Sequence, residues 1–336
     1  SDREEYGFEA LDLGNIAHKS LETFSKKADA QKMKWQEIPE ALRDEMIDES
    51  VEESVIDYGN TVLFSSARNE YMITRIKRLI RTSVWALTKQ IEKGDFLPSG
   101  YEMQFGSGKI DRIDTCFDND CVYVKVTDYK TGMKSFDITA LYHGLQMQLP
   151  VYLNAALDVE QRKHPHKTIV PAGIFYYRIQ DPGFSESILK ELKQDGLVNG
   201  DDMVISHLEK ELSGNSLLFP IGRNKDGSLS KTSHALPEEL FRLVLSFAKR
   251  KEESVKDRMY DGEVSASPYE MGETTGCDYC PYRDICGFDP RLEGCSYRRL
   301  ERYSSDDAVK KMREALEENV SRDASENEQS GKGREG

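Results

Sequence analysis

The sequence predicts an α/β fold in which a central mixed sheet is flanked by helices on both sides. Three observations predict this class. Two segments in the first hundred residues repeat apolar residues at helical spacing, three short β-prone segments then follow in close succession, and another helical pattern and another β-prone segment come next. Helices and strands that alternate along one chain are typical of a sheet covered by helices.

The first two helices are expected at 13–24 and 61–93. In the first, the apolar residues share one face, and His18 lies one turn before Glu22, which fixes the histidine on a rigid element. An acidic segment at 44–57 leads into the second helix. The polar face of that helix carries Arg75, Arg78, Arg81 and Lys89. A solvated face is the expected role of such a charge run, and phosphate binding is the alternative.

The sheet is expected to contain strands at 101–105, 109–117, 122–129 and 168–177. The first three are separated by Gly, Asp or Asn, so we expect them to be neighbours. A helical pattern covers 141–157, before the fourth strand. Pro150 lies inside it and should kink or split the helix, because proline lacks an N–H and clashes with the preceding turn.

The remaining chain divides into a helix, a cysteine-bearing lobe and a polar tail. Pro237 is expected to begin a helix that runs toward residue 260. We predict one domain over 1–300, with a helical insert at 60–93 and a cysteine lobe at 270–300. An exposed, charged helix at 306–318 and a disordered polar tail are expected to make up residues 301–336.

Composition limits the classes of function. The chain has 336 residues, 46 basic and 60 acidic, and a formal net charge of −14. Such a charge argues against a protein that coats nucleic acid by neutralising phosphates, so any DNA contact must be local. No run approaches the roughly 18 to 20 apolar residues that span a bilayer, and the N-terminus has no signal-peptide pattern. We therefore expect no membrane association and a cytoplasmic location.

The motif that indicates chemistry joins two strands that each end in acid. It reads Gly108-Lys-Ile-Asp111-Arg-Ile-Asp114, then a short loop and a second strand that ends in Asp128-Tyr-Lys130. Carboxylates can hold a divalent cation, and the cation can activate water for phosphodiester hydrolysis. Asp128 and Lys130 point to the same face because side chains alternate along a strand. Asp114 is the alternative to Asp111 as the first acid.

A second glycine-rich pattern overlaps this motif. Residues 105–109 read Phe-Gly-Ser-Gly-Lys, as in part of a phosphate-binding P-loop. The full pattern fails, because Met103 stands where the first glycine belongs and Ile110 replaces the serine or threonine. We therefore expect no ATPase motor in this sequence.

The ordered set of motifs resembles the RecB-like branch of the PD-(D/E)xK nuclease superfamily, which has a restriction-endonuclease-like core. In that branch a helix histidine in a G-x-x-x-H-x-x-L-E context precedes the strands, and residues 14–22 match it. Asp111 matches the first acidic motif, and Asp128-Tyr-Lys130 matches the second. A Q-x-x-x-Y motif follows on a helix and is matched by Gln148 and Tyr152. Tyr142 and Gln146 lie just before it.

The resemblance implies a role for each matched residue. His18, Asp111 and Asp128 would ligate Mg²⁺ or Mn²⁺, and Lys130 would act at the phosphate. Gln148 and Tyr152 would position the DNA or the side chains around the metal. The alternative is that the acids only cap strands and His18 is a surface histidine. This is favoured for any residue alone but not for the ordered set.

Cysteines 277, 280 and 286 form a C-x2-C-x5-C run that can converge on one metal centre. Three ligands need a fourth, which Cys295 could supply, and a four-cysteine site suits either zinc or iron-sulfur. In the AddB-type nucleases, the resemblance implies a 4Fe-4S cluster completed by a distant cysteine on the N-terminal side. Arg3-Glu4 resembles the family sequence just after that cysteine. We therefore expect the fourth ligand to precede Ser1 and the cluster to be incomplete or absent without it.

The resemblance also implies a function and a setting. It implies an Mg²⁺-dependent exonuclease of the bacterial cytoplasm that cuts the 5′-ended strand during double-strand-break repair. The DNA would be a single-stranded end, and the heterodimer partner would be an AddA-type helicase-nuclease subunit. A stand-alone Cas4-like exonuclease and a catalytically silent iron-sulfur or zinc module that braces DNA are the alternatives. The insert at 60–93 argues against the first, and the intact acids and Lys130 argue against the second.

Overall fold

The structure is a computed structural model that describes the backbone of residues 10–59, 67–106, 108–183 and 187–332. The chain divides into two compact units. The first comprises Ser1–Phe136 with Tyr152–Phe241, and the second comprises Asp137–Val151 with Arg242–Gly336. The acids of the nuclease-like motif therefore belong to the first unit, and cysteines 277–295 belong to the second. The division predicted at residue 300 does not coincide with this one.

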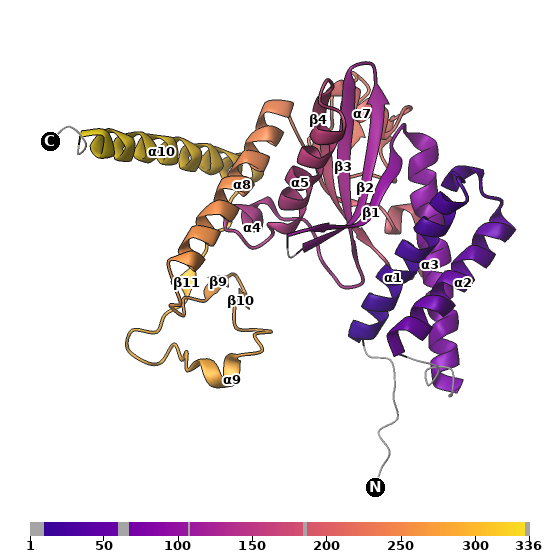
Figure 1. Cartoon of the computed structure of the whole chain (residues 1–336), viewed down its shortest axis with the longest axis horizontal. Helices are drawn as coiled ribbons and strands as arrows, with labels where there is room; N and C mark the ends of the chain where they lie inside the picture. Colours follow the sequence, from indigo (N-terminus) through magenta and orange to yellow (C-terminus); the bar gives the residue numbers. More distant parts are fainter. Residues whose placement is uncertain (1–9, 60–66, 107, 184–186, 333–336) are drawn as a thin grey trace, which may run out of the picture. The chain divides into compact units, whose positions relative to one another are not determined.

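A six-stranded mixed sheet forms the centre of the first unit (Figure 1). Its order is β1 (Leu97–Phe105), β2 (Gly108–Asp118), β3 (Cys121–Lys130), β4 (Thr168–Arg178), β5 (Asp195–Asn199) and β8 (Ala235–Leu236). The strands β1 to β3 are antiparallel, whereas β4 runs parallel to β3 and β8 parallel to β5. Residues 122–129 and 169–177 are all buried, as expected for central strands covered on both faces. The mixed sheet and its four predicted strands are confirmed.

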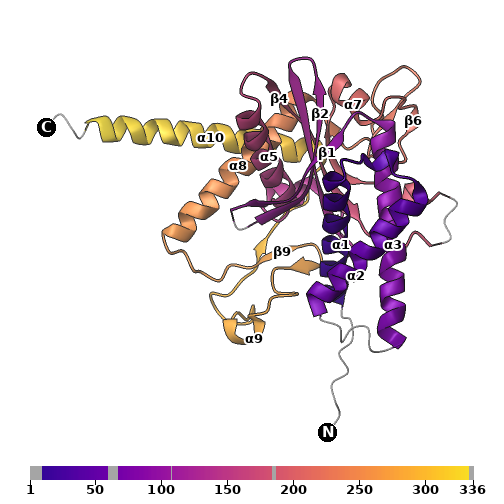
Figure 2. The same cartoon turned by 45° about the vertical axis from the view of Figure 1, so that its right-hand side comes forward.

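Three helices pack together beside the sheet (Figure 2). They are α1 (Ala10–Ala30), α2 (Glu40–Gly59) and α3 (Ala67–Lys93), and a short 3-10 helix, η1 (Trp35–Glu37), joins the first two. Their buried apolar residues form one core with Tyr129 and Tyr177 of the sheet. Both predicted helices are confirmed within the described residues, and residues 60–66 of the predicted insert lie outside them.

Helix α2 replaces the acidic segment that we expected only as a connection. Its buried face consists of Met46, Ile47, Val51 and Val55 together with two serines. Ser50 and Ser54 donate to the backbone oxygen four residues earlier. Its acids pair with the basic face of α3. Arg81 binds Asp48 at 2.5 Å, and Lys77 binds Glu52. Of the predicted charge run, only Arg81 pairs with α2, whereas Arg78 pairs with Asp181 and Lys89 with Glu92. Exposed ion pairs of this kind are expected for a solvated face.

The helical pattern at 141–157 is split, as predicted, but not at Pro150. Helix α4 (Ile138–Tyr142) ends first, and α5 (Gln148–Lys163) begins after a turn. Pro150 lies in the first turn of α5, where the backbone N–H has no partner within the helix, so proline costs little there. The turn contains Gly144 at a φ of 86°, a conformation that favours glycine.

A second apolar core covers another part of the sheet. It joins Cys116, Tyr123 and Phe175 to residues of helix α7 (Asp202–Leu208) and of the loop after it. The remaining elements of this unit are α6 (Ile188–Glu191), β6 (Gly214–Asn215) and β7 (Gly222–Arg223). Burial raises the pKa of the Cys116 thiol to about 12, so this cysteine is a packing residue and not a reactive one.

The second unit contains two long helices and a small sheet. Helix α8 (Glu238–Tyr260) confirms the helix predicted after Pro237. The small sheet has three strands in the order β10 (Thr274–Thr275), β9 (Tyr269–Met271) and β11 (Arg298–Arg299). The short helix α9 (Arg283–Cys286) lies between β10 and β11 in the sequence. Tyr142 of α4 stacks on Phe247 of α8, with ring centres 5.8 Å apart.

The last helix, α10 (Ser305–Lys332), differs from the prediction in two ways. Its first turns are not wholly exposed, because Ala308, Val309 and Met312 are buried. The helix also continues through the residues expected to be disordered, as far as Lys332. The reason is composition: residues 305–332 contain no proline, and a single glycine lies at the end of the helix, so nothing stops propagation once the buried turns have nucleated it.

Membrane-spanning character is not found in the described part of the chain. The two longest described helices, α3 and α10, carry charged residues along most of their length. A helix that crosses a bilayer needs about 20 mainly apolar residues. None of the described helices combines that length with that apolar character.

Candidate active site

Two neighbouring strands bring the predicted acids together. Arg112 of β2 pairs with Thr127 of β3, so the next pair outward is Asp111 and Asp128. Residues directly opposite in an antiparallel pair point to the same face, with Cβ atoms about 5 Å apart. The Tyr129 N–H donates to Asp111 Oδ2 at 2.7 Å and holds that carboxylate in place. Both acids of the motif therefore face one site.

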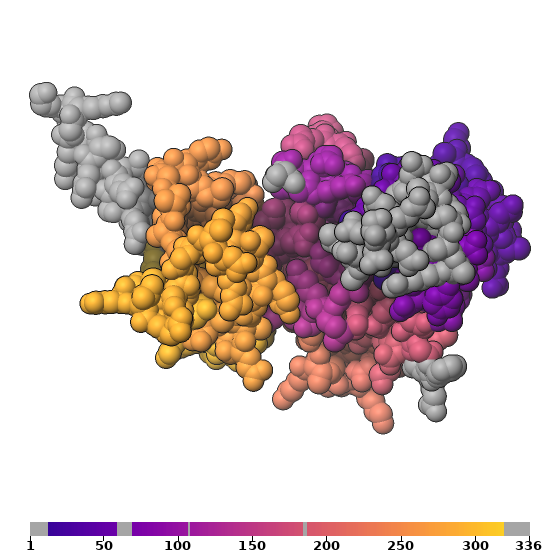
Figure 3. Space-filling view, turned by 90° about the horizontal axis from the view of Figure 1, so that it is seen from below, coloured from indigo at the N-terminus to yellow at the C-terminus, as the bar shows by residue number. Residues whose placement is uncertain are grey.

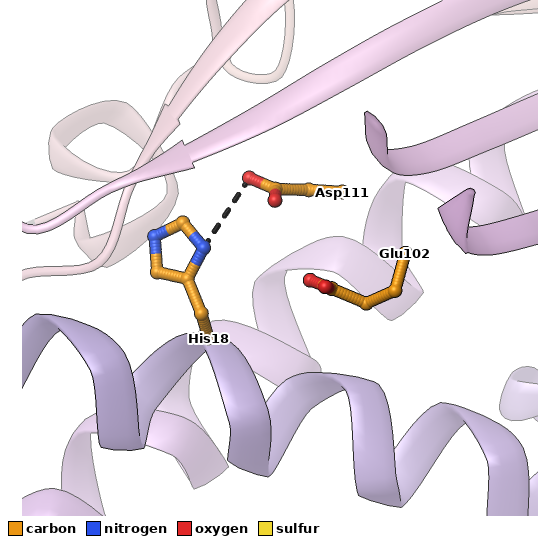
Figure 4. Close-up of side chains that lie close together, drawn as sticks. All are labelled: His18, Glu102 and Asp111. Atoms are coloured by element: carbon orange, nitrogen blue, oxygen red, sulfur yellow. Dashed lines mark ion pairs between the residues drawn. The ribbon is translucent and has the colours of Figure 1, made fainter. Parts of the chain in front are cut away.

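Helix α1 supplies His18 to this site. His18 Nδ1 lies 3.4 Å from Asp111 Oδ2 (Figure 4). The helix is anchored by Ile16 and Leu21, which are fully buried. Gly14 lets the helix approach the end of β3, because a Cβ at this position would lie only 3.1 Å from Thr131 Oγ1. Gly14 thus allows α1 to pack closely against the sheet, and this close packing brings His18 to Asp111.

Glu102 is a third acid at the site, and the sequence did not predict it. It lies between Tyr101 and Met103, whose partners on β2 are Arg112 and Ile110, so it faces Asp111. Ligand atoms of His18, Glu102 and Asp111 all lie within 4.8 Å of one another, and this is the only such group of three or more within the described residues (Figure 4). The φ of Glu102 is 49°, unusual for a residue that is not glycine. Backbone strain of this kind is common among residues of active sites and ligand clamps.

Each acid of the site has one basic partner. His18 faces Asp111, Lys109 contacts Glu102, and Lys130 Nζ lies 2.5 Å from Asp128 Oδ2. Lys109 was noted in the sequence only as part of the failed P-loop pattern, and the structure gives it a place at the site. The side chains of the three carboxylates are less than 10% exposed.

The electrostatics of Asp128 indicate a site that favours a cation. Burial raises the pKa of Asp128, and the nearby Asp111 raises it further. Lys130 and His18 oppose this shift, but they do not cancel it. Carboxylates that destabilise one another in this way gain from a divalent cation between them. The donor set of oxygen atoms and one imidazole suits Mg²⁺ or Mn²⁺.

A cavity of about 480 Å³ opens onto these side chains. It is lined by His18, Glu102, Lys109 and Asp111, and by Gly14 and Thr131 where helix and strand approach. A profile of the PD-(D/E)XK nuclease superfamily matches residues 2–287 of the sequence, which covers both the cavity and the sheet. The chain belongs to this superfamily. The family predicted from the motifs is thereby confirmed.

Similar curated proteins extend the comparison beyond the superfamily. The chain is 34% identical to the B subunit of the ATP-dependent helicase/deoxyribonuclease of Alkaliphilus metalliredigens, over 93% of this chain and 30% of that protein. Proteins of the same name from Lachnoclostridium phytofermentans and Clostridioides difficile are 35% and 33% identical, over 89% and 93% of this chain. The chain spans about 30% of the length of these relatives.

The predicted Q-x-x-x-Y motif of this nuclease-family chain is divided between the two units. Tyr152 lies in the first unit, where its hydroxyl accepts the Lys109 N–H at 3.4 Å. Gln148 is the first residue of α5 and belongs to the second unit, with Gln146 and Tyr142. The side-chain oxygen of Gln146 accepts the N–H of Asp137 at 3.1 Å. The structure thus brings Tyr152 to the hairpin of the site, and the role of Gln148 stays a prediction.

Asp114, the alternative first acid, lies on the opposite face of β2 from Asp111. It is 1% exposed and binds Arg112 Nε at 2.7 Å as well as Lys125 of β3. Burial alone would raise the pKa of Asp114, but the two cations outweigh it and lower the pKa. Asp114 is therefore a core residue in a buried ion triad, and Asp111 is the acid of the site.

The residues of the P-loop-like pattern belong to a β-hairpin. Phe105 of β1 pairs with Gly108 of β2, and Gly106 turns the chain at a φ of 53°. Ser107 lies outside the described residues. A P-loop joins a strand to a helix, whose N-terminus binds the phosphates. A hairpin between antiparallel strands offers no such terminus, so the structure agrees with the failed sequence pattern.

The cysteine segment has no apolar core of its own. No residue between Gly272 and Leu300 is buried, and Tyr279 and Ile285 are at least 80% exposed. Figure 3 shows this part of the chain at the surface, in light orange. Its cysteines lie on consecutive turns. The Cys280 N–H donates to Cys277 O at 3.4 Å, and the N–H of Cys286, the last residue of α9, donates to Tyr282 O at 2.8 Å. Small segments without a core usually need a metal or a cross-link to hold one structure. The segment therefore fits a metal-bound lobe.

The described cysteines are not gathered as closely as the ligands of a single zinc ion. Four thiolates around one zinc ion, each about 2.3 Å from it, would bring their Sγ atoms to about 4 Å from one another. No three of the described cysteines have Sγ atoms within 4.8 Å of one another. A four-iron cluster binds each thiolate through a different iron, so its ligands stand further apart. Arg3-Glu4, next to which the sequence predicts the distant ligand, lies outside the described residues.

Proposed function

We propose that this chain hydrolyses phosphodiester bonds of DNA in a reaction that depends on Mg²⁺ or Mn²⁺. One observation carries the proposal: Glu102, Asp111 and Asp128 lie side by side across three strands, with His18 beside Asp111 and Lys130 beside Asp128. The superfamily is one of nucleases. The word deoxyribonuclease in the names of the relatives supports DNA as the substrate.

The site residues divide the work between holding the metal and binding the phosphate. A bound Mg²⁺ would polarise the scissile phosphate and lower the pKa of the attacking water. His18, Glu102 and Asp111 would hold the ion, and Asp128 would add a carboxylate from β3. Lys130 would bind a phosphate oxygen and stabilise the charge that develops on it. Tyr152, which lies against the hairpin, would position the DNA strand.

The direct test is digestion of single-stranded DNA that carries a label at either end. We expect cleavage that requires Mg²⁺ or Mn²⁺, stops with a chelator and is lost in Lys130→Ala. We also propose an exonuclease that cuts the 5′-ended strand, so short labelled products should come first from the 5′-labelled DNA. A folded chain that binds Mn²⁺ but never cuts DNA would contradict the proposal and favour the bracing module.

We further propose that the chain works with an AddA-type helicase-nuclease subunit in double-strand-break repair. The relatives are named as the B subunit of an ATP-dependent helicase/deoxyribonuclease, and the P-loop-like pattern of this chain forms a hairpin instead of a nucleotide site. A partner would then supply the motor. Retention of this chain on an immobilised AddA-type protein supports the proposal. DNA digestion that is fully independent of such a partner would favour the Cas4-like alternative.

Glu102→Gln is expected to weaken Mn²⁺ binding by at least about tenfold. Removing a residue that only orients a metal ligand already costs about tenfold in affinity, and a direct ligand should cost no less. The reason is that Glu102 places one of three ligand atoms within 4.8 Å. His18→Ala should give a similar loss. Isothermal titration with Mn²⁺ measures both. Glu45→Gln, which removes an exposed acid of α2, is the matched control and should leave the affinity unchanged. Equal affinities in Glu102→Gln and the control would exclude Glu102 as a ligand.

We propose that Cys277, Cys280 and Cys286 ligate a 4Fe-4S cluster. After reconstitution with iron and sulfide, Cys280→Ser should lose most of the bound iron and become sensitive to protease between residues 272 and 300, because this segment has no buried residue. Cys121→Ser, at the start of β3, is the control and should keep both properties. Cys295→Ser tests the fourth ligand within the chain. Iron content that is the same in Cys280→Ser and Cys121→Ser would refute the cluster.

A further inference from the structure

The row of acids continues across the sheet beyond the metal-binding residues. Asp128 of β3 pairs with Tyr176 of β4, and Tyr176 pairs with Asp195 of β5. Neighbouring strands lie about 4.8 Å apart, so Asp195 is about 10 Å from Asp128 across the sheet. A DNA strand with one phosphate at Asp128 and Lys130 therefore needs only a short extension to reach the surroundings of Asp195.

Two lysines occupy the space between these positions. Lys130 Nζ and Lys134 Nζ lie 5.8 and 4.8 Å from the ring centre of the buried Tyr176. Lys134 is exposed and has no ion-pair partner among the residues that the structure describes. Partial desolvation of its amine, with the nearby Lys130, lowers the pKa of Lys134, and Asp128 opposes this shift. A phosphate beside Lys134 would relieve this repulsion between amines.

A cavity of about 500 Å³ lies beside Asp195. Basic side chains dominate the charged part of its lining, which includes Lys190, Lys193 and His234. Asp195 is the only acid in this lining, and it is already engaged: His234 Nδ1 lies 3.4 Å from one oxygen, and the Phe136 N–H donates to the other at 2.7 Å. Within the described chain, no carboxylate lies within 4 Å of Lys190 or Lys193. The lining also includes the hydroxyl and amide groups of Thr232 and Asn215, besides apolar residues such as Leu217.

We infer that Lys134, Lys190 and Lys193 form a phosphate-binding track that carries single-stranded DNA from the acids to the cavity beside Asp195. The inference rests on the proposed nuclease function and adds the path of the substrate. Amines that can meet successive phosphates are how proteins follow a nucleic-acid backbone. The cavity offers hydrogen-bonding groups but no exposed aromatic platform, so it fits phosphates better than stacked bases.

The test compares DNA binding by Lys190→Gln/Lys193→Gln with that of a control. A fluorescent oligothymidylate of about 20 nucleotides, longer than common single-strand sites, is titrated in a chelator, so no cleavage interferes. We expect roughly tenfold weaker binding. The slope of log Kd against log salt should fall by about 1.4, which is roughly 0.7 for each lost phosphate contact of a single strand. Lys225→Gln/Lys249→Gln removes two exposed lysines outside the cavity and is the control.

Cleavage provides the second readout. The double variant should raise KM for the long oligonucleotide and leave kcat, and the cleavage of a dinucleotide, unchanged, because only the long substrate reaches the cavity. A salt slope equal to that of the control, or no binding by the unaltered chain, overturns the track. A chain that shows the expected difference in binding but never cleaves DNA would instead contradict the proposed function.

Discussion

Asp128→Asn is expected to lower kcat for DNA cleavage by at least about 1,000-fold, which corresponds to about 4 kcal/mol of lost transition-state stabilisation. Asparagine keeps the size of the side chain and removes its charge. Asp128 is 2% exposed and lies opposite Asp111 in the register of β2 and β3. Its loss would therefore remove a buried carboxylate from the metal site and leave the ammonium of Lys130 without its acid.

The matched control for this prediction is Asp120→Asn. Asp120 lies in the exposed turn between the same two strands, and its backbone oxygen, which the change does not alter, accepts the N–H of Thr168. It should retain full activity. Thermal unfolding followed by circular dichroism shows whether each variant is folded. If a folded, Mn²⁺-loaded Asp128→Asn cuts DNA at the rate of the control, Asp128 has no catalytic role.

Asp114→Asn is expected to cost about 3–5 kcal/mol of unfolding free energy, the usual loss when one partner is removed from a buried ion pair. Arg112 and Lys125 would remain 2% and 3% exposed, with no carboxylate between them. Lys125 lies about 6 Å from the ring centres of Phe96, Phe175 and Phe219, so water cannot easily replace the lost acid. Urea unfolding followed by circular dichroism measures the loss.

A second variant separates charge from packing at this triad. Asp114→Asn/Lys125→Met removes one of the two cations that the single change leaves uncompensated, so it should be less destabilised than Asp114→Asn. Asp111→Asn should show the reverse behaviour of Asp114→Asn, with activity lost and stability retained. An Asp114→Asn variant as stable as the unaltered chain would show that the triad contributes little to the fold.

The sequence predicted the sheet because its strands have a local signature. β-Branched and aromatic residues dominate 122–129 and 168–177, as is typical of central strands covered on both faces. Helix α2 escaped prediction for the opposite reason. Its buried residues Met46, Ile47, Val51 and Val55 do repeat at helical spacing, but acidic side chains outnumber them in this segment, and so polar a composition is typical of a connection.

At the end of the chain, too, a polar composition hid a helix. Polar, aromatic-free sequence predicted disorder after residue 320, yet α10 continues to Lys332. Polarity lowers the amount of surface that a segment can bury, but it does not lower helix propensity, and residues such as Glu, Lys and Ala favour a helix once it has started. The buried Ala308 and Met312 provide that start.

The residues of the site were predicted where chemistry and spacing lie within one strand or one helix. His18 on its helix, and Asp128 and Lys130 on one strand, have spacings that alternation and helical periodicity convert directly into a shared face. Asp111 and Asp114 could not be separated by their types, since both are acids of the same motif. The structure separates them because their positions differ by three, so they point to opposite faces of β2.

What the sequence determined by itself was the superfamily, the mixed sheet and the identity of the acids and lysine of the motif, because each of these depends on order within short segments. Only the tertiary structure decided that Glu102 joins them and that Tyr176, Asp195 and the lysines near them extend the same row. These residues lie as far apart in the sequence as Glu102 and Asp195, and the register that aligns their strands is set by pairing and burial across the whole sheet.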